Sequence, residues 1–574
     1  MIHQSDVTIV GGGIAGLYAA FTATEHCRVA IVSKVHVTRS HSVAAQGGIA
    51  ASLGNEEEDR WEWHMFDTAK GSDYLADQDM TEILAKEAPN AVVALERMGV
   101  PFSRNAAGKI EQRRFGGHTR NFGEAPVKRA CYVSDRTGRA IMDTLYDQCL
   151  TRGVEFFNEV FIVKLLFRDG RCVGAEGYDI SDCKPQVFHS KAVVLATGGC
   201  GRIFKVTSNG YSSTGDGFGL ALDAGVPLED MEFVQFHPTG IYGLGILVSE
   251  AARAEGGILT NGRGERFMER YAPTLKELAP RDIISRAILT EIREDRGVNG
   301  SDFVHLDLRP IGKEGLAQKL PEITSLVQTY LGINASEEAI PVAPTCHYIM
   351  GGIPTDAEGH VLTDEGRSEV LGLYAVGECA CVSVHGANRL GCNSLIDLVV
   401  FGKRVGVSVA KYVEKTLLLQ LPPESENDLE STLNRVMNSH GESSVPTLRE
   451  TMQRVMTDKC SVFRDQDGLT KALAAIRELK QKHASLNLGN RSKSFNYELQ
   501  DALELGNMLK TAEVILFSAL KRTESRGCHF RNDYPERNDD EWLKHTLIYV
   551  LNEGLAADHK PVIVTKFSPE KRRY

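Results

Sequence analysis

Four short segments of the chain carry side chains that can bind a small anion. FVQFHPTG places His237 before a proline, and PTCHYIMGG places His347 ahead of two glycines. LAPRDIISRA holds Arg281, and HGANRLGCNSL holds Arg389 among small residues. A guanidinium binds a carboxylate through two parallel hydrogen bonds, and an imidazole adds a further charge-assisted one. Together the four side chains predict a cationic pocket for a small dianion.

Each of these residues also has a structural interpretation. A single histidine is more often a structural residue than a catalyst, and an arginine beside an acid, such as Arg281 beside Asp282, more often forms a surface ion pair. The functional interpretation is favoured because all four residues lie next to glycine or proline turns near a predicted domain junction. Functional groups are commonly presented in such places.

The N-terminal segment predicts a dinucleotide site. Gly11, Gly13 and Gly16 form a GxGxxG motif that follows an apolar strand-like run and opens an alanine-rich helix. The N-terminus of that helix offers free N–H groups to a pyrophosphate. An acid usually follows about 20 residues later to bind a ribose. Ser33 and Lys34 stand there instead, which disfavours NAD and leaves the ribose contact to Ser33 or to backbone.

Two later segments complete the fold class, which is α/β. KAVVLATGGCGRIF (191–204) and GLYAVGECA (372–380) are predicted to be strands that end in small residues, as strands lining a ligand crevice do. They predict a discontinuous Rossmann-like domain, residues 1–237 and 351–420, with an inserted α+β capping domain, 238–350. An apolar stripe through Leu505, Leu509 and Leu516 predicts packed amphipathic helices within a domain at 425–530. Residues 531–574 are assigned to a small terminal lobe.

Composition and sequence patterns limit the kinds of partner and the cellular compartment that we expect for this chain. The chain has 574 residues, too many for one core, and a net charge of -11, which argues against nucleic acid. It has no apolar run of 18 or more residues, so we expect no membrane span. The N-terminus resembles no export signal, which favours a prokaryotic cytoplasm. The twelve cysteines form no CxxC cluster, so we expect reduced thiols and no iron–sulfur cluster.

Over nearly its whole length the sequence resembles the flavoprotein subunits of the succinate dehydrogenase and fumarate reductase family. The motifs that carry the resemblance are TRSHSVAAQGGIAA, RRFGGHTR, LATGGCGR, MEFVQFHPTG, APRDIISRA, CHYIMGG, GLYAVGECA, HGANRLGCNSL and SRGCHFRNDYPERNDDEWLKH.

The resemblance implies roles for single residues. The histidine of RSH, here His41, would carry FAD through a covalent bond. His237, Ser249, Glu250, His347 and Arg389 would bind succinate or fumarate, with serine at 249 where relatives often have threonine. Arg281 would transfer the proton, with Glu250 and Arg253 relaying protons to solvent and His237 and His347 assisting catalysis. The implied cofactor-binding residues are Gly11, Gly13, Ile14, Ala15, Gly16, Ser33, Lys34, Ser40, His41, Gln46, Gly47, Gly48, Thr197, Gly198, Asp216, Glu378, Arg389, Ser394 and Leu395.

The resemblance also implies partners. An iron–sulfur subunit would take electrons from the flavin, and membrane anchor subunits with quinone would hold the complex at the cytoplasmic side of a prokaryotic inner membrane. Two other interpretations stay open on the residues alone: an L-aspartate oxidase-like flavoenzyme, and a non-catalytic flavin-binding scaffold such as a tRNA-handling flavoprotein. The physiological direction of the reaction is open as well.

Overall fold

A six-stranded sheet forms the centre of the largest unit of the protein. The computed structural model describes residues 1–364, 368–423, 425–552 and 554–572. The sheet order is β18-β19-β11-β2-β3-β7, and all neighbours are parallel except the β18–β19 pair. The strands are β2 (Val7–Val10), β3 (Val29–Ser33), β7 (Glu155–Asn158), β11 (Ala192–Leu195), β18 (His360–Thr363) and β19 (Ser368–Ala375).

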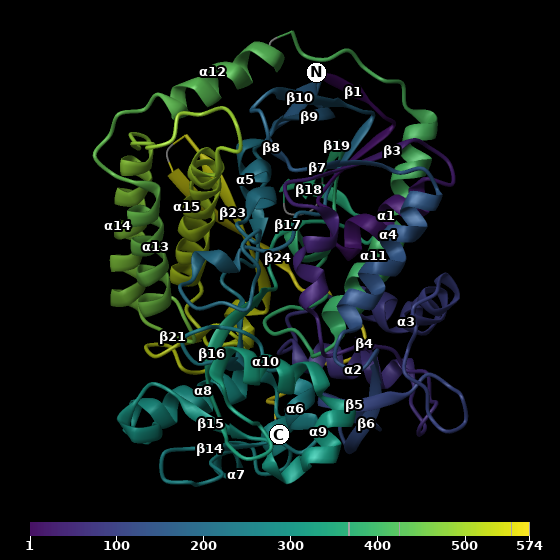
Figure 1. Ribbon diagram of the computed structural model, residues 1–574, viewed down its shortest axis with the longest axis vertical. Helices are drawn as coiled ribbons and strands as arrows, with labels where there is room; N and C mark the ends of the chain where they lie inside the picture. The colour runs from purple at the N-terminus through teal and green to yellow at the C-terminus, as the bar shows by residue number, and fades with distance from the viewer. Residues whose placement is uncertain (365–367, 424, 553, 573–574) are drawn as a thin grey trace.

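Both faces of this sheet are covered, which explains the unbroken apolar runs of its strands. Ile9 faces a helical layer, whereas Val10 faces a second sheet on the other side. The helices are α1 (Ile14–Ala23), α3 (Gln78–Met98), α4 (Thr137–Thr151) and α11 (Asn393–Lys415). The covering sheet contains β1 (Ile2–Gln4), β8 (Val160–Arg168), β9 (Arg171–Asp179) and β10 (Pro185–His189). We call this layered assembly, residues 1–233 and 350–415, the Rossmann-like unit (Figure 1).

Smaller elements complete the Rossmann-like unit. They are α2 (Trp61–Gly71), α5 (Asp216–Asp223), the sheet of β4 (Ile49–Ala50), β5 (Gln112–Arg120) and β6 (Ala125–Cys131), and the pair β17 (Ile353–Pro354) with β20 (Ala380–Cys381).

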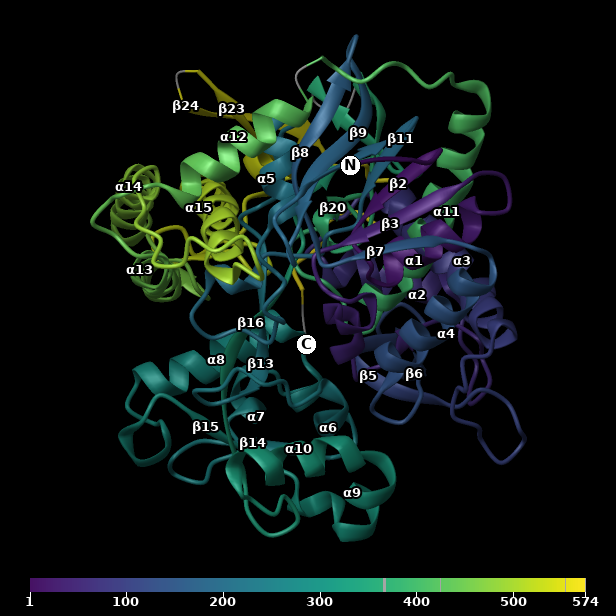
Figure 2. The same ribbon diagram turned by 45° about the horizontal axis from the view of Figure 1, so that its top comes forward.

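Residues 234–349 form a separate body, the capping unit, around an antiparallel sheet of order β13-β16-β15-β14. Figure 2 shows it standing apart at the bottom of the view. Its strands are β13 (Val234–Ile241), β14 (Ile258–Thr260), β15 (Val304–Asp307) and β16 (Ile340–Ile349). Its helices are α6 (Glu250–Ala254), α7 (Met268–Tyr271), α8 (Arg281–Arg293), α9 (Lys313–Lys319) and α10 (Pro321–Leu331). The predicted boundary at 237/238 falls within β13.

The helices predicted after residue 424 pack against the Rossmann-like unit. They are α12 (Ser425–Met437), α13 (Val445–Lys459), α14 (Gln466–His483) and α15 (Tyr497–Lys521). Leu505, Leu509 and Leu516 of the predicted stripe are buried on α15, which lies against α5. No helix among the described residues is both long enough and apolar enough to cross a membrane.

The C-terminal residues fold back onto the Rossmann-like unit. They form β22 (Phe530–Arg531), which pairs with β21 (Phe463–Arg464), then α16 (Asp539–Trp542) and the hairpin of β23 (Lys544–Leu551) and β24 (Gly554–Pro561). Strand β23 pairs with β12 (Leu228–Glu229), so the hairpin extends a sheet begun more than 300 residues earlier.

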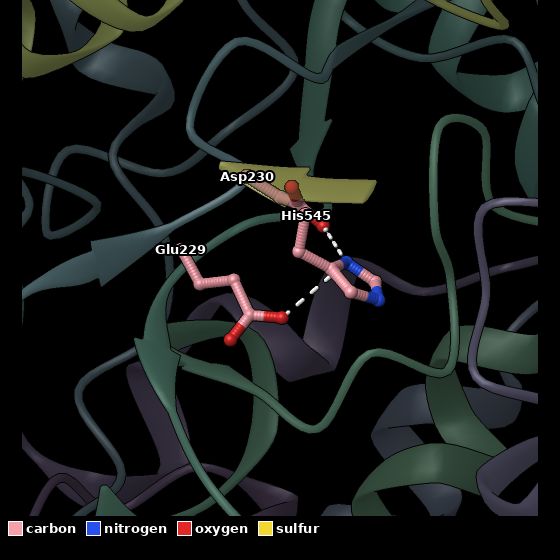
Figure 3. A group of neighbouring side chains, drawn as sticks. All are labelled: Glu229, Asp230 and His545. Atoms are coloured by element: carbon pink, nitrogen blue, oxygen red, sulfur yellow. Dashed lines mark hydrogen bonds and ion pairs between the residues drawn. The ribbon is translucent and has the colours of Figure 1, made fainter. Parts of the chain in front are cut away.

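A buried ion cluster fixes this hairpin. His545 Nδ1 lies 2.6 Å from Asp230 and 3.4 Å from Glu229 (Figure 3), and its Nε2 lies 3.2 Å from Asp77. Lys560 of β24 also contacts Glu229, at 2.9 Å. Burial lowers the pKa of His545, but the carboxylates outweigh it and raise the pKa to about 10. The ring is therefore an imidazolium that donates from both nitrogens to the surrounding carboxylates.

We expect His545→Gln to destabilise the hairpin by about 3–5 kcal/mol near neutral pH, because it leaves buried carboxylates without their cationic partner. The pKa of His545 is raised above its ordinary value of about 6.5, so its stabilisation is complete below about pH 6.5. It is lost as the pH rises through about 10. Thermal unfolding of the wild type and the variant from pH 6 to 10 measures this. His559→Gln on β24, which packs against Trp542, is the control. A difference that fails to shrink with rising pH contradicts the assignment.

Candidate active site

A cavity of about 960 Å³ runs from the carboxyl ends of β2, β3 and β11 to the capping unit. All but two of the predicted site residues line it; the exceptions are Gly16 and Arg253. The lining residues from the predicted set are Gly11, Gly13, Ile14, Ala15, Ser33, Lys34, Ser40, His41, Gln46, Gly47, Gly48, Thr197, Gly198, Asp216, His237, Ser249, Glu250, Arg281, His347, Glu378, Arg389, Ser394 and Leu395.

The glycine loop closes because two of its residues lack a Cβ. Gly11 adopts φ +114°, and a Cβ there would lie 2.2 Å from the Ala196 carbonyl oxygen. A Cβ on Gly16 would lie 2.2 Å from the Gly11 oxygen, so Gly16 allows the turn without reaching the cavity. Helix α1 begins at Ile14 and α11 begins at Asn393, both beside the cavity. Two helix N-termini therefore present N–H groups where an anion can bind.

Lys34 occupies the place where an acid usually binds a ribose. Its ammonium contacts Asp216 at 2.6 Å, Glu504 of α15 at 2.8 Å and the Thr214 hydroxyl at 2.6 Å. Burial opposes its charge, but the two carboxylates raise its pKa. Lys34 is therefore a compensated cation, and the helical region contributes to this end of the cavity.

His41 lies in a short 3₁₀ turn, His41–Ala44, on the cavity wall. The Gly210 N–H donates to its Nδ1 at 3.2 Å, and the Asn209 amide nitrogen lies 3.1 Å from its Nε2. The same amide donates to the His347 carbonyl at 2.9 Å. Burial lowers the pKa of His41 to about 4. Because Nδ1 accepts from the Gly210 N–H and burial opposes a second proton, the ring is a neutral imidazole, the form that can act as a nucleophile.

At the other end of the cavity two guanidinium groups share one acceptor. Arg281 Nη1 and Arg389 Nη2 both donate to Gln235 Oε1, at 2.9 and 3.1 Å. The Gln235 amide donates in turn to Asn388 and to the Arg389 carbonyl. Arg389 also lies over the ring of Tyr348, 4.3 Å from its centroid. Burial, and next the charge of Arg281, lower the pKa of Arg389 to about 10.

Glu250 connects this end to the capping unit. Its Oε2 accepts from Arg281 Nε at 2.9 Å, and its Oε1 accepts from the Gly116 N–H at 2.8 Å. Arg253 lies one helical turn further along, 3.6 Å from Glu250 Oε2, and donates to the Glu277 carbonyl. Arg253 is enclosed and does not reach the cavity, whereas Arg281 and Glu250 do.

The two predicted histidines lie together, with ring centroids 5.1 Å apart. His237 Nδ1 accepts from the Thr239 N–H at 3.2 Å, so its Nε2 carries the proton, and that buried N–H has no partner among the residues that the structure describes. His347 Nδ1 contacts the Ser208 hydroxyl at 2.7 Å. Burial, and next the charge of Arg281, hold both pKa values well below the usual range. The sequence predicted a charge-assisted hydrogen bond from histidine to the anion. In the structure both imidazoles are neutral, so any such hydrogen bond comes from an uncharged donor.

Several buried polar atoms of the cavity wall have no partner within the described part of the chain, which is the pattern of a ligand site. They are Ser40 Oγ, Gln46 Oε1, Thr197 Oγ1, His237 Nε2 and Arg389 Nε. Burial raises the pKa of Glu378, which also lines the cavity, to about 7. The volume and these donors and acceptors fit an extended dinucleotide with a small dianion beside it.

The sequence analysis missed four residues of the site, and three of them carry no recognisable local signal. Gln235, Asn209 and Glu504 act through contacts to residues far away in the chain, and no spacing marks them. Phe115 lines the cavity, and its ring lies against two glycines: a Cβ at Gly47 would come within 2.8 Å of it and one at Gly391 within 2.5 Å. Phe115 lies in the RRFGGHTR motif, where the aromatic ring could have been noticed.

Comparisons with known proteins agree with this geometry. A family model described as FAD binding domain matches residues 6–395, and one described as fumarate reductase flavoprotein C-term matches residues 449–574. The chain is 48% identical to the succinate dehydrogenase flavoprotein subunit of Rickettsia conorii, over 99% of this chain and 97% of that one. It is 40% identical to the fumarate reductase flavoprotein subunit of Mycobacterium tuberculosis, over the full length of both. A solved mutant of E. coli quinol fumarate reductase superposes with a TM-score of 0.93 at 36% identity, covering 100% and 99% of the two chains.

Gln235→Glu places a carboxylate between the two guanidinium groups without changing the size of the side chain. We expect it to weaken binding of malonate, a small dicarboxylate, by about tenfold or more, equivalent to at least ~1.4 kcal/mol. Gln328→Glu on the exposed face of α10 makes the same change in net charge away from the site. Calorimetric titration with malonate compares the two variants. Equal affinities would show that Gln235 does not set the charge of the pocket.

Proposed function

The chain belongs to the family of succinate dehydrogenase and fumarate reductase flavoprotein subunits, and we propose that its cavity is where succinate and fumarate are interconverted with FAD. The observation that best supports this proposal is the pair of guanidinium groups that share Gln235 Oε1 at one end of a dinucleotide-sized cavity. The fold class expected from the sequence is confirmed by the superposition on E. coli quinol fumarate reductase. The aspartate oxidase and scaffold interpretations are not favoured.

The cavity has room for FAD: the N-terminus of α1 would hold the pyrophosphate, and Ser33 and Asp216 would hold the adenosine end. When bound, it supplies the hydride acceptor for succinate oxidation and the hydride donor for fumarate reduction. The unpartnered hydroxyl and amide groups of the cavity wall are available to hold it.

The dicarboxylate would be held by two kinds of hydrogen-bond donor, neutral side chains and a charged guanidinium group. The His237 N–H, the Ser249 hydroxyl and His347 supply neutral hydrogen bonds, and Arg389 supplies the charged contact for a carboxylate. Ser249 is the N-cap of α6 and also accepts from the Ala251 N–H, which fixes its side chain. Such fixed donors orient the substrate and exclude water from the reacting carbons.

Arg281 is the proposed proton-transfer residue. An arginine is normally a fixed cation, so donation of a proton to a substrate carbon is straightforward, whereas acceptance needs a transiently neutral guanidine. The contact between Arg281 Nε and Glu250 provides a carboxylate that can return or remove that proton. Glu250, with Arg253 behind it, would pass protons toward solvent.

We also propose that FAD is attached covalently to His41. Its neutral imidazole and its position on the cavity wall support this, as does the RSH motif. A covalent link is expected to raise the flavin potential, and for a two-electron couple each ~30 mV corresponds to about 1.4 kcal/mol.

The chain is proposed to act as one subunit of a membrane-bound complex. An iron–sulfur subunit would receive the electrons, and anchor subunits with quinone would hold the pair at the cytoplasmic side of a prokaryotic inner membrane. Support comes from the relatives, one of which is a quinol fumarate reductase. The domain divisions at 237, 350, 420 and 530 also remain predictions.

His41→Ser is expected to release its flavin on acid denaturation, whereas the wild type keeps a yellow polypeptide. The variant should still bind FAD through the glycine loop, yet lose most succinate oxidation. Absorbance of the acid-precipitated protein measures this. His36→Ser, an exposed histidine five residues earlier that does not line the cavity, is the matched control and should keep its flavin. Flavin that washes from the wild type in acid contradicts covalent attachment.

Succinate should bleach the visible flavin spectrum of the wild type, and fumarate should restore it.

Arg281→Gln should abolish turnover in both directions while malonate still binds. Arg389→Gln should weaken malonate binding itself by roughly 2–5 kcal/mol, because a buried charged contact is lost. Arg293→Gln, at the far end of the same helix, should have neither effect. Near-normal turnover in Arg281→Gln would remove this residue from the mechanism.

A further inference from the structure

The last described residues of the chain form a strap across the Rossmann-like unit. After β24, the Ile563 N–H donates to Asp77 at 2.7 Å. Gln78 Oε1 then accepts from the N–H groups of Thr565, Lys566 and Phe567, and its amide donates back to the Phe567 carbonyl at 2.6 Å. The ring of Phe567 packs against Phe66 and Phe122. The strap is thus held along its length by side chains of the Rossmann-like unit.

The strap ends with an arginine placed between the two units that enclose the cavity. Arg572 Nη2 lies 3.0 Å from Asp73 Oδ2 in the Rossmann-like unit and 2.6 Å from Asp282 Oδ2 in the capping unit. Its side chain is only 8% exposed. One buried guanidinium therefore connects two carboxylates that belong to different bodies.

Asp282 is next to the proposed proton-transfer residue. It is the second residue of α8, and Arg281 is the first. Asp282 also pairs with Arg286 one turn later, at 3.0 Å, and Arg286 donates to the Gly527 carbonyl. The start of α8 is thus fixed through Asp282, which does not itself line the cavity.

Asp73 is equally well fixed on its side of the junction. It pairs with Arg537 at 2.9 Å and accepts from the Gly527 N–H at 2.9 Å. Without Arg572, the carboxylates of Asp73 and Asp282 would face one another with less compensation, and like charges at a buried junction repel. The cation at the end of the strap removes that repulsion.

We propose that Arg572 is a positioning residue, which holds the start of α8 against the Rossmann-like unit and thereby sets Arg281 in the site. This inference rests on the proposed function. It extends the set of residues that shape the active site to the end of the strap, although Arg572 does not line the cavity. A small displacement of Arg281 is enough to matter, since about 1 Å of misplacement can cost 10²-fold in rate.

The test compares Arg572→Ala, Arg572→Lys and Lys566→Ala in the full-length holoprotein. Lys566 is the control because it lies on the same strap but pairs with Glu82 and lies over Trp61, both within the Rossmann-like unit. Hydrogen exchange of the α8 amides is measured first, since it does not depend on turnover. Arg572→Ala should speed exchange at the start of α8, Arg572→Lys should do so less, and Lys566→Ala should leave it unchanged.

Turnover is then measured in both directions, together with the solvent deuterium isotope effect. Arg572→Ala should lower kcat by about 10- to 100-fold, with a larger isotope effect because proton transfer becomes slower, and Arg572→Lys should recover part of the rate. Unchanged exchange at α8 overturns the proposal, and so does faster exchange with kcat and isotope effect unchanged. A wild type inactive with succinate and fumarate would refute the proposed function instead, and α8 exchange would still decide whether Arg572 fixes that helix.

Discussion

Two arginines of like charge lie buried beside each other at one end of the cavity, and the rest of the site is arranged around their repulsion. Arg281 and Arg389 share a neutral acceptor, Gln235, instead of each having a carboxylate. Glu250 compensates Arg281, and the ring of Tyr348 supports Arg389. Because burial removes the water that would screen these charges, the pocket retains an excess of positive charge that only an anion can neutralise.

The same excess charge decides the state of the neighbouring histidines. His237 and His347 stay neutral because burial and the nearby guanidinium groups both oppose a further proton. A neutral imidazole has one donor, and the Thr239 N–H determines which nitrogen of His237 carries it. In the proposed function the charge of the dicarboxylate would therefore be met by the arginines, while its orientation would be set by the histidines and Ser249.

The sequence predicted the parts of this arrangement that have local signals. Gly11, Gly13 and Gly16 predicted the strand, turn and helix, and the turns around Arg281 and Arg389 predicted a site near a junction. The roles of single residues came from the family resemblance, since spacing alone does not assign them. Gln235, Asn209 and Glu504 were missed because their partners lie far away in sequence. The charge state of the histidines depends on packing, so it could not be read from residue types.

The ion pair between Lys34 and Glu504 has a consequence for biosynthesis. Its two residues are separated by 470 positions, and Glu504 lies on α15, among the last helices to leave the ribosome. A nascent chain that has released only its glycine loop and first strands lacks this counter-charge, and it also lacks Arg389 at the other end of the cavity. The cavity is therefore complete only after nearly the whole polypeptide has emerged, and we expect FAD to reach its final position after translation.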